Sequence, residues 1–341
     1  MVLIGSVVAD SVVRLPDVLD TPTTLRAAAN RSTVTGIARS GQVLVAVGPR
    51  GMILRSADGA ATWKQVTAPV GADFTSVRFS GPDTAWIVGH DSVILKSTDG
   101  GLNWERMLDG RGLLKTLTQA ARTDPVLAKS VARTMRQSAT PDTWPSALMD
   151  VHFVDANRGF AVGAFGLLLA TADAGKTWQP WVNRADNERQ FHLYAMHGEG
   201  NQLYIAGEQG LLLRLDEVAQ RFVRVKTPYN GSYFGVLVAG NQILAYGLRG
   251  NAYLSGDAGA SWNRIETGTE VNLVGAGLVP GRLWVATQSG DILTGPLAAG
   301  KLERTASLPG PDVYGAVALD AGRLAVARLN GVVTVNAQLA N

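Results

Sequence analysis

The chain of 341 residues contains no cysteine, which excludes disulfides, thiolate metal sites and cysteine nucleophiles together. Proline is also scarce, with 14 residues against 39 glycines, so we expect many tight turns rather than disorder. No apolar run approaches the ~20 residues that a membrane-spanning helix requires, and we expect a chain that does not span a membrane. Since 46% of the residues are hydrophobic, the chain can nevertheless bury a large core.

The patterns of catalytic and cofactor-binding sites are missing as well. The four histidines, His90, His152, His192 and His197, show no metal-ligand spacing. There is no glycine-rich phosphate loop before a helix and no Ser/His/Asp set in a recognisable context. We therefore predict a protein that is not an enzyme and has no metal or cofactor, and we do not expect a small-molecule ligand.

An internal repeat organises the chain. Glycine-rich turns recur at intervals of 41, 74, 44, 40, 40 and 41 residues, and they align at Gly51, Ser92, Gly166, Gly210, Gly250, Gly290 and Gly331. Blades of four strands have a period of ~40 to 45 residues, so seven units fit and one interval is too long.

Each unit has the periodicity of strands. A short apolar run precedes every turn, at residues 43–47, 85–88, 159–162, 203–206, 243–246, 283–286 and 324–327. This pattern predicts one all-β domain over residues 1–341, a seven-bladed β-propeller of four-stranded antiparallel blades. The last unit has only three strands, so we expect residues 11–16 to complete that blade.

Four units share a box with the spacing of Ser97, Asp99, Gly101 and Trp104. Its aspartates and tryptophans are Asp58 and Trp63, Asp99 and Trp104, Asp173 and Trp178, and Asp257 and Trp262, and a weaker copy has Asp216 and Phe222. An aspartate in such a turn accepts backbone hydrogen bonds, and glycine allows the positive φ. The tryptophan buries ~150 to 250 Å² between sheets. The box is therefore predicted to be structural.

This motif is the Asp-box, or bacterial neuraminidase repeat. With seven units, the chain resembles a bacterial relative of the photosystem II assembly/stability factor family, from about residue 34 to the C-terminus. The resemblance implies a non-enzymatic assembly or accessory factor that is exported to the periplasm. Its expected partner is a membrane protein complex or its periplasmic portion, for which a resistance-nodulation-division type transporter is a candidate.

Two other functions are compared with this one. The Asp-box also occurs in sialidases, and Arg14 within residues 13–16 resembles their opening arginine segment, so a glycosidase or carbohydrate-binding propeller is the alternative. Sialidase propellers generally have six blades, which argues against it. Nucleic-acid binding is not expected, because the chain has no basic run interleaved with aromatic residues.

The long interval contains residues 109–147, a helical insert between the second and third blades. We predict helices over residues 111–122 and from Asp124, as N-cap before Pro125, to about residue 138. Six basic residues against three acidic ones make the insert as basic as the whole chain, at +3: Arg111, Lys115, Arg122, Lys129, Arg133 and Arg136. Either these residues contact an acidic partner or anionic lipid, or the hairpin is solvated and packs its apolar side on the propeller.

Propeller topology places the insert on the same face as the turns between the second and third strands of each blade. Those turns contain Arg50, His90, Asp91, Glu208, Arg249 and Gln288. Because loops on a rigid scaffold commonly carry binding, we expect recognition on this face, with Arg50, His90, Asp91, Arg249 and the basic insert residues as contacts.

The first ten residues contain a short apolar run without the basic region of a complete signal peptide. Val7 and Ala9 would suit a cleavage point before Asp10. An ordinary N-terminal strand explains this segment equally well.

Overall fold

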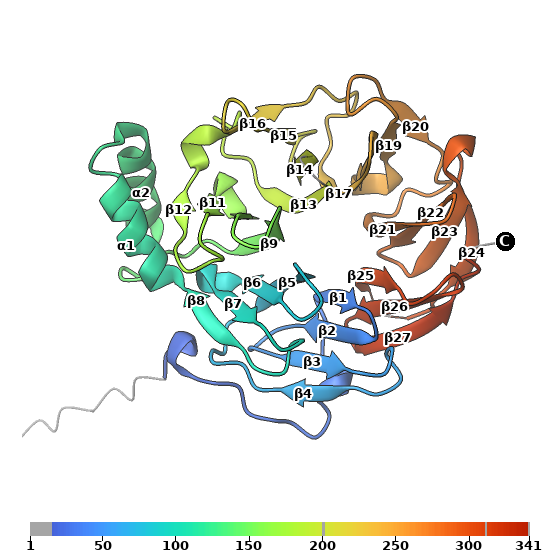
Figure 1. The fold of residues 1–341 in the computed structure, drawn as a ribbon, viewed down its shortest axis with the longest axis horizontal. Helices are drawn as coiled ribbons and strands as arrows, with labels where there is room; N and C mark the ends of the chain where they lie inside the picture. Colours follow the sequence, from blue (N-terminus) through green and yellow to red (C-terminus); the bar gives the residue numbers. More distant parts are fainter. Residues whose placement is uncertain (1–15, 200–201, 311, 340–341) are drawn as a thin grey trace, which may run out of the picture.

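The computed structural model describes residues 16–199, 202–310 and 312–339. Its strands form seven sheets around a ring, as Figure 1 shows. In every sheet the strands follow one another in chain order, and neighbours are antiparallel. The first strands of successive sheets contact one another, and β25 also contacts β1, so the ring closes. The predicted seven-bladed propeller is confirmed.

The sheets are numbered as blades 1 to 7 from the N-terminus. Blade 1 contains β1 (Gly36–Ser40), β2 (Val43–Val47), β3 (Ile53–Ser56) and β4 (Lys64–Val66). Blade 2 contains β5 (Phe74–Phe79), β6 (Ala85–Gly89), β7 (Ile94–Ser97) and β8 (Glu105–Leu108). Blade 3 contains β9 (Leu148–Phe153), β10 (Gly159–Gly163), β11 (Leu168–Thr171) and β12 (Gln179–Pro180). Blade 4 contains β13 (Leu193–Glu199), β14 (Gln202–Gly207), β15 (Leu212–Asp216) and β16 (Arg221–Arg224).

Blade 5 contains β17 (Tyr233–Ala239), β18 (Gln242–Gly247), β19 (Ala252–Ser255) and β20 (Asn263–Ile265). Blade 6 contains β21 (Leu273–Val279), β22 (Arg282–Thr287), β23 (Asp291–Pro296) and β24 (Glu303–Ser307). Blade 7 contains β25 (Val313–Ala318), β26 (Arg323–Arg328) and β27 (Gly331–Asn336).

Within the described residues, blade 7 has three strands. Of the segment expected to complete it, residues 11–15 lie outside the described part of the chain. The short 3-10 helix η1 (Val18–Asp20) lies beside blade 2, where Leu19 O accepts a hydrogen bond of 2.7 Å from Arg106. A second 3-10 helix, η2 (Ala29–Arg31), contacts β27 and β4. The Val34 amide then donates to Arg328 O at 2.9 Å, which joins blade 7 to blade 1.

The hydrophobic core lies between neighbouring blades. One cluster joins blades 1 and 2 through Val45, Ile53, Ile87 and Leu95, and similar clusters fill the spaces between the other blades. The second strand of each blade is almost completely buried, as in β6 and β10. This explains why these strands are short continuous apolar runs in the sequence.

In the Asp-box turns, the carboxylate holds the backbone as the sequence predicts. Asp99 Oδ1 accepts from Ser97 Oγ at 2.8 Å and from the Asn103 amide at 2.9 Å. The other three boxes repeat this pattern, and the pKa of each box aspartate is lowered to about 2. For Asp58 the largest cause is the hydrogen bond from the Thr62 hydroxyl. For Asp99, burial opposes the shift but its hydrogen bonds outweigh it.

Each box tryptophan packs against the preceding blade. Trp178 of blade 3 meets Trp86 of blade 2 edge to face, with ring centroids 6.4 Å apart. Trp104 packs on the core shared with blade 1, and Trp63 packs on the core shared with blade 7. The box therefore positions a tryptophan side chain between two neighbouring blades.

The insert forms the helices α1 (Gly110–Ala120) and α2 (Pro125–Gln137), at the side of the ring in Figure 1. The first helix ends two residues earlier than predicted, because residues 121–123 already turn. Asp124 caps α2 through the amides of Val126 and Leu127, as expected. Leu113, Leu117 and Leu127 pack on blades 2 and 3. No helix in the described ranges is long and apolar enough to cross a membrane.

A matched pair of box variants tests how closely the box turn packs on the preceding blade. Gly101 has a φ of 85°, and an added Cβ would lie 2.6 Å from Val45 Cγ2 of blade 1. We expect Gly101→Ala to lower the free energy of unfolding by roughly 2 kcal/mol or more, measured by denaturant titration. Ala60 occupies the equivalent left-handed position in blade 1. Ala60→Gly should stay within about 0.5 kcal/mol of the wild type, because relief of backbone strain and loss of chain stiffness oppose each other. Equal losses in both variants would contradict the prediction.

Candidate functional site: the turn face and the central channel

The turns between the second and third strands of each blade lie beside the residue that precedes its first strand. The amide of His90 donates to Asp73 O at 2.8 Å, that of Ala164 to Ala147 O at 2.9 Å, and that of Leu248 to Ser232 O at 3.0 Å. These turns and the connections between blades therefore share one face, which also carries the insert. We call it the turn face.

The predicted contacts on the turn face differ in accessibility. Arg50, His90 and Arg249 are exposed. Arg50 belongs to blade 1 and Arg249 to blade 5, so the structure does not bring these two arginines into one cluster. Glu208 accepts from the His192 amide at 2.7 Å, and Gln288 accepts from Asn272 at 2.9 Å.

Asp91 lies under the start of the insert. It is only partly accessible, and an added Cβ on Gly110 would lie 2.9 Å from its carbonyl oxygen. Burial raises the pKa of its carboxyl, and the nearby acids Asp17, Asp73 and Asp109 act in the same direction. Asp91 therefore supports the base of the insert.

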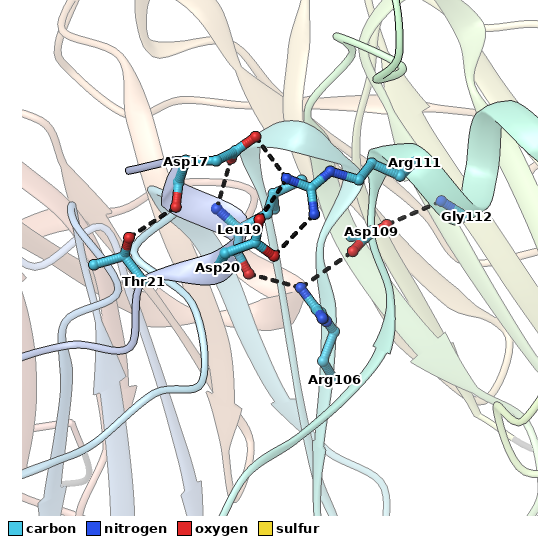
Figure 2. A network of polar contacts seen from close by, with 8 residues as sticks. All are labelled: Asp17, Leu19, Asp20, Thr21, Arg106, Asp109, Arg111 and Gly112. Carbon is cyan, nitrogen blue, oxygen red and sulfur yellow. Dashed lines mark hydrogen bonds and ion pairs between the residues drawn. The ribbon is translucent and has the colours of Figure 1, made fainter. Parts of the chain in front are cut away.

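Arg111, one of the basic residues of the insert, holds the N-terminal segment, as Figure 2 shows. Its Nη2 lies 2.6 Å from Asp17 Oδ2 and 2.8 Å from Asp20 Oδ2. The Leu19 amide and Arg111 lower the pKa of Asp17, and Arg111 lowers that of Asp20. This guanidinium is already neutralised within the chain.

Four of the other basic residues of the insert have no partner within the described chain. Lys115, Arg122, Lys129 and Arg136 are exposed, and within the described residues their side chains have no hydrogen bond or ion pair. Arg133 donates to Gln190 of the connection before blade 4. Four cations of the insert thus remain accessible to a partner.

An arginine cluster that the sequence analysis missed lies on the turn face between blades 7 and 1. A hollow of about 330 Å³ is lined by Arg26, Arg31 and Arg50, and no acidic residue lines it. All three arginines are exposed, and their side chains make no hydrogen bond or ion pair with the described part of the chain. We call it the arginine hollow.

The central channel contains a buried ion pair, also missed. Arg78 of blade 2 binds Asp150 of blade 3 through two bonds, of 2.9 and 2.7 Å. Asp150 also accepts from Ser76 Oγ and from the amides of Val151 and Met196. The Asp150 side chain is 2% exposed and that of Arg78 is 42% exposed. Burial alone would raise the pKa of Asp150, but Arg78 and the hydrogen bonds lower it.

Two histidines share this channel. His152 and His197 have ring centroids 6.4 Å apart. His197 Nδ1 accepts from the Val238 amide at 3.0 Å, so a neutral ring carries its proton on Nε2. Burial, with repulsion from Arg78, lowers the pKa of each ring to about 4.

The remaining predicted residues give no reactive centre. The box aspartates lie in turns of four different blades, on the face opposite the turn face. Arg14, on which the sialidase alternative depended, lies outside the described residues. Among the residues that the structure describes, no group of histidine and acidic side chains could hold a metal ion.

The fold and its four boxes define the protein as an Asp-box propeller. A family model described as photosynthesis system II assembly factor YCF48 matches residues 37–120 and 132–276. Since the match covers more than half of the chain, the protein belongs to the YCF48 family of assembly-factor propellers, which the sequence resemblance had indicated.

A curated relative and two solved YCF48 structures are among the proteins to which this chain is similar. The photosystem II assembly lipoprotein Ycf48 of Synechococcus sp. (strain CC9902) is 30% identical over 118 residues, which span 33% of this chain and 35% of the relative. A structure titled YCF48 bound to D1 peptide has a TM-score of 0.65 at 14% identity, covering 93% of this chain and 96% of that one. YCF48 from Cyanidioschyzon merolae has a TM-score of 0.64 at 17% identity, covering 92% and 98%. At these identities the two structures show the fold.

The channel histidines predict a pH dependence of stability. The folded rings have pKa values of about 4, below the ordinary 6.5, so between these values the unfolded chain binds more protons. Stability should therefore fall as the pH drops from 6.5 toward 4, by up to about 1.4 kcal/mol per pH unit for each histidine. Denaturant unfolding across this range measures the slope. His152→Gln and His197→Asn should each reduce it, and a slope unchanged in the double variant would contradict the assignment.

Proposed function

We propose that this protein is a non-enzymatic accessory or assembly factor that binds a membrane protein complex through its turn face. Membership of the YCF48 family supports this role. The observation that carries it is the arginine hollow, because three exposed arginines around a hollow that no acidic residue lines favour an acidic segment or a terminal carboxylate. The accessible cations of the insert add to the positive charge of the same face.

Export and the particular partner are finer parts of this proposal. The curated relative is a lipoprotein, which supports export to the periplasm. The partner that the sequence resemblance suggests is a resistance-nodulation-division type transporter, bound at its periplasmic portion. Capture and identification of the partner tests the second point directly.

The binding prediction uses a charge-matched pair of variants. The triple variant Arg26→Gln, Arg31→Gln, Arg50→Asn removes the hollow's charge, and Asn suits the left-handed backbone of Arg50, whose φ is 58°. We expect it to lose most of the membrane complex that the wild type retains in pull-downs from detergent-solubilised membranes. Binding by the wild type should weaken with salt.

The control carries the same change of charge elsewhere. Lys64, Arg224 and Arg264 are exposed on outer strands of three blades. Their triple substitution by Gln should leave retention unchanged. Equal loss in both variants, or capture of no membrane protein by the wild type, would contradict the proposed function.

A further inference from the structure

A cleft of about 480 Å³ lies between α2 and the propeller on the turn face. Val126, Leu127 and Ser130 of α2 form one wall, and Phe165 and Val182 of blade 3 form the other. Trp144 lies among the lining residues, and its indole Nε1 is buried without a hydrogen-bond partner among the described residues. Val126, Leu127 and Ser130 lie between the two segments that the family model matches, residues 37–120 and 132–276.

Two bulky apolar side chains in this cleft are exposed to water. Val126 is 72% exposed and Phe165 is 63% exposed. Phe165 has a φ of 57°, a backbone conformation that is unfavourable for a bulky residue. The equivalent left-handed positions in other blades hold polar residues, namely Arg50, Asp91, Gln209 and Arg249. The turn therefore does not need an aromatic ring, and the exposed ring is available for binding.

The apolar surface continues beyond the cleft as a row of rings. Phe165 packs on His192 with centroids 4.8 Å apart, His192 stacks on Tyr194 at 6.2 Å, and Tyr194 meets Phe234 at 5.6 Å. All four rings are at least partly accessible. The row leads from the cleft to the first strands of blades 4 and 5, which is a path suited to an extended chain.

The charge of the cleft is acidic, in contrast to the outer surface of the insert. The charged residues that line it are Asp124, Glu188 and Arg221. Arg221 is neutralised by an ion pair with Asp186. Glu188 is exposed and makes no hydrogen bond or ion pair with the described residues. The charge left in the cleft therefore favours a basic group.

We propose that this cleft binds an extended segment of a partner protein, which places a bulky apolar side chain between Val126 and Phe165 and an adjacent Lys or Arg beside Glu188. The segment would continue over the row of rings. This inference rests on the proposed function, since it names a second type of sequence that the turn face recognises, separate from the acidic sequence expected at the arginine hollow.

Peptide binding to the full chain tests the charge rule. Fluorescent peptides with the same leucine anchor and with lysine, serine or glutamate neighbours are titrated, and anisotropy gives the Kd. The lysine peptide should bind about tenfold more tightly than the glutamate peptide. Glu188→Lys should reverse this order. Binding that is equal for the three peptides, or undetectable for all, would overturn the proposal.

Apolar variants test the anchor site. Phe165→Asn keeps a residue that accepts left-handed backbone, and it should weaken the lysine peptide about tenfold, as should Val126→Asp. Val218 is the matched control, because it is 98% exposed in the turn between β15 and β16, on the opposite face. Val218→Asp should not change the Kd. Equal weakening by both Asp variants would contradict the proposal. A change of oligomeric state caused by Val126→Asp would also contradict it, because a second copy of the chain would then be the occupant of the cleft.

Failure of this inference can be told apart from failure of the proposed function. If the membrane complex is still captured but the peptides do not bind, only the cleft assignment is wrong. If the lysine peptide binds with the expected dependence on Glu188 and Phe165 but no membrane complex is captured, the cleft assignment stands and the accessory role fails.

Discussion

Packing between neighbouring blades is the constraint on which the rest of this structure depends. A single four-stranded blade has two faces that must be buried. In this ring one face packs on the preceding blade and the other on the following blade. The Asp-box serves this packing. Its carboxylate fixes the turn, and the turn directs a tryptophan such as Trp178 onto the preceding blade. The box turns on one face of the ring are therefore held in a fixed conformation. On the turn face, by contrast, exposed turn residues do not pack in the core, so the core does not determine which residues stand there.

At the centre of the ring a polar interaction adds to this packing. Asp150 is bonded at once to Arg78 of blade 2, to its own strand and to the Met196 amide of blade 4, so one carboxylate joins the first strands of three blades. Removing one partner of such a buried pair commonly costs about 3 to 5 kcal/mol, because the other charge is left uncompensated. The same burial keeps His152 and His197 neutral. Stability and its pH dependence therefore have a common origin in the channel.

The fold could be predicted from the sequence because its signals are local and repeated. The box spacing, the apolar runs and the cap at Asp124 each lie within a few residues, and seven repeats average out the ambiguity of any single one.

The candidate site was harder to predict from the sequence. Arg26 and Arg31 lie near Arg50 only because the N-terminal segment crosses β27 and β4. The sequence did contain one signal for this cluster, since residues 21–57 include five arginines and no acidic residue. Arg78 and Asp150 are 72 residues apart, and no spacing connects them. Phe165 could have been noticed as the aromatic residue in an otherwise polar turn position.

The charge pattern of the turn face links the insert to the propeller. The sequence left open whether the basic residues of the insert contact an acidic partner or lie on a solvated hairpin. In the structure Arg111 instead fixes the N-terminal segment, and the cleft between α2 and the propeller has an apolar wall and the acidic residues Asp124 and Glu188. The arginine hollow, by contrast, lies at the junction of blades 7 and 1. Because the ring between these two regions is held by continuous core packing, their separation cannot adjust to a partner. A segment that is acidic at one end and basic and apolar at the other would therefore bind in one direction only, since reversing it would place like charges together at both regions.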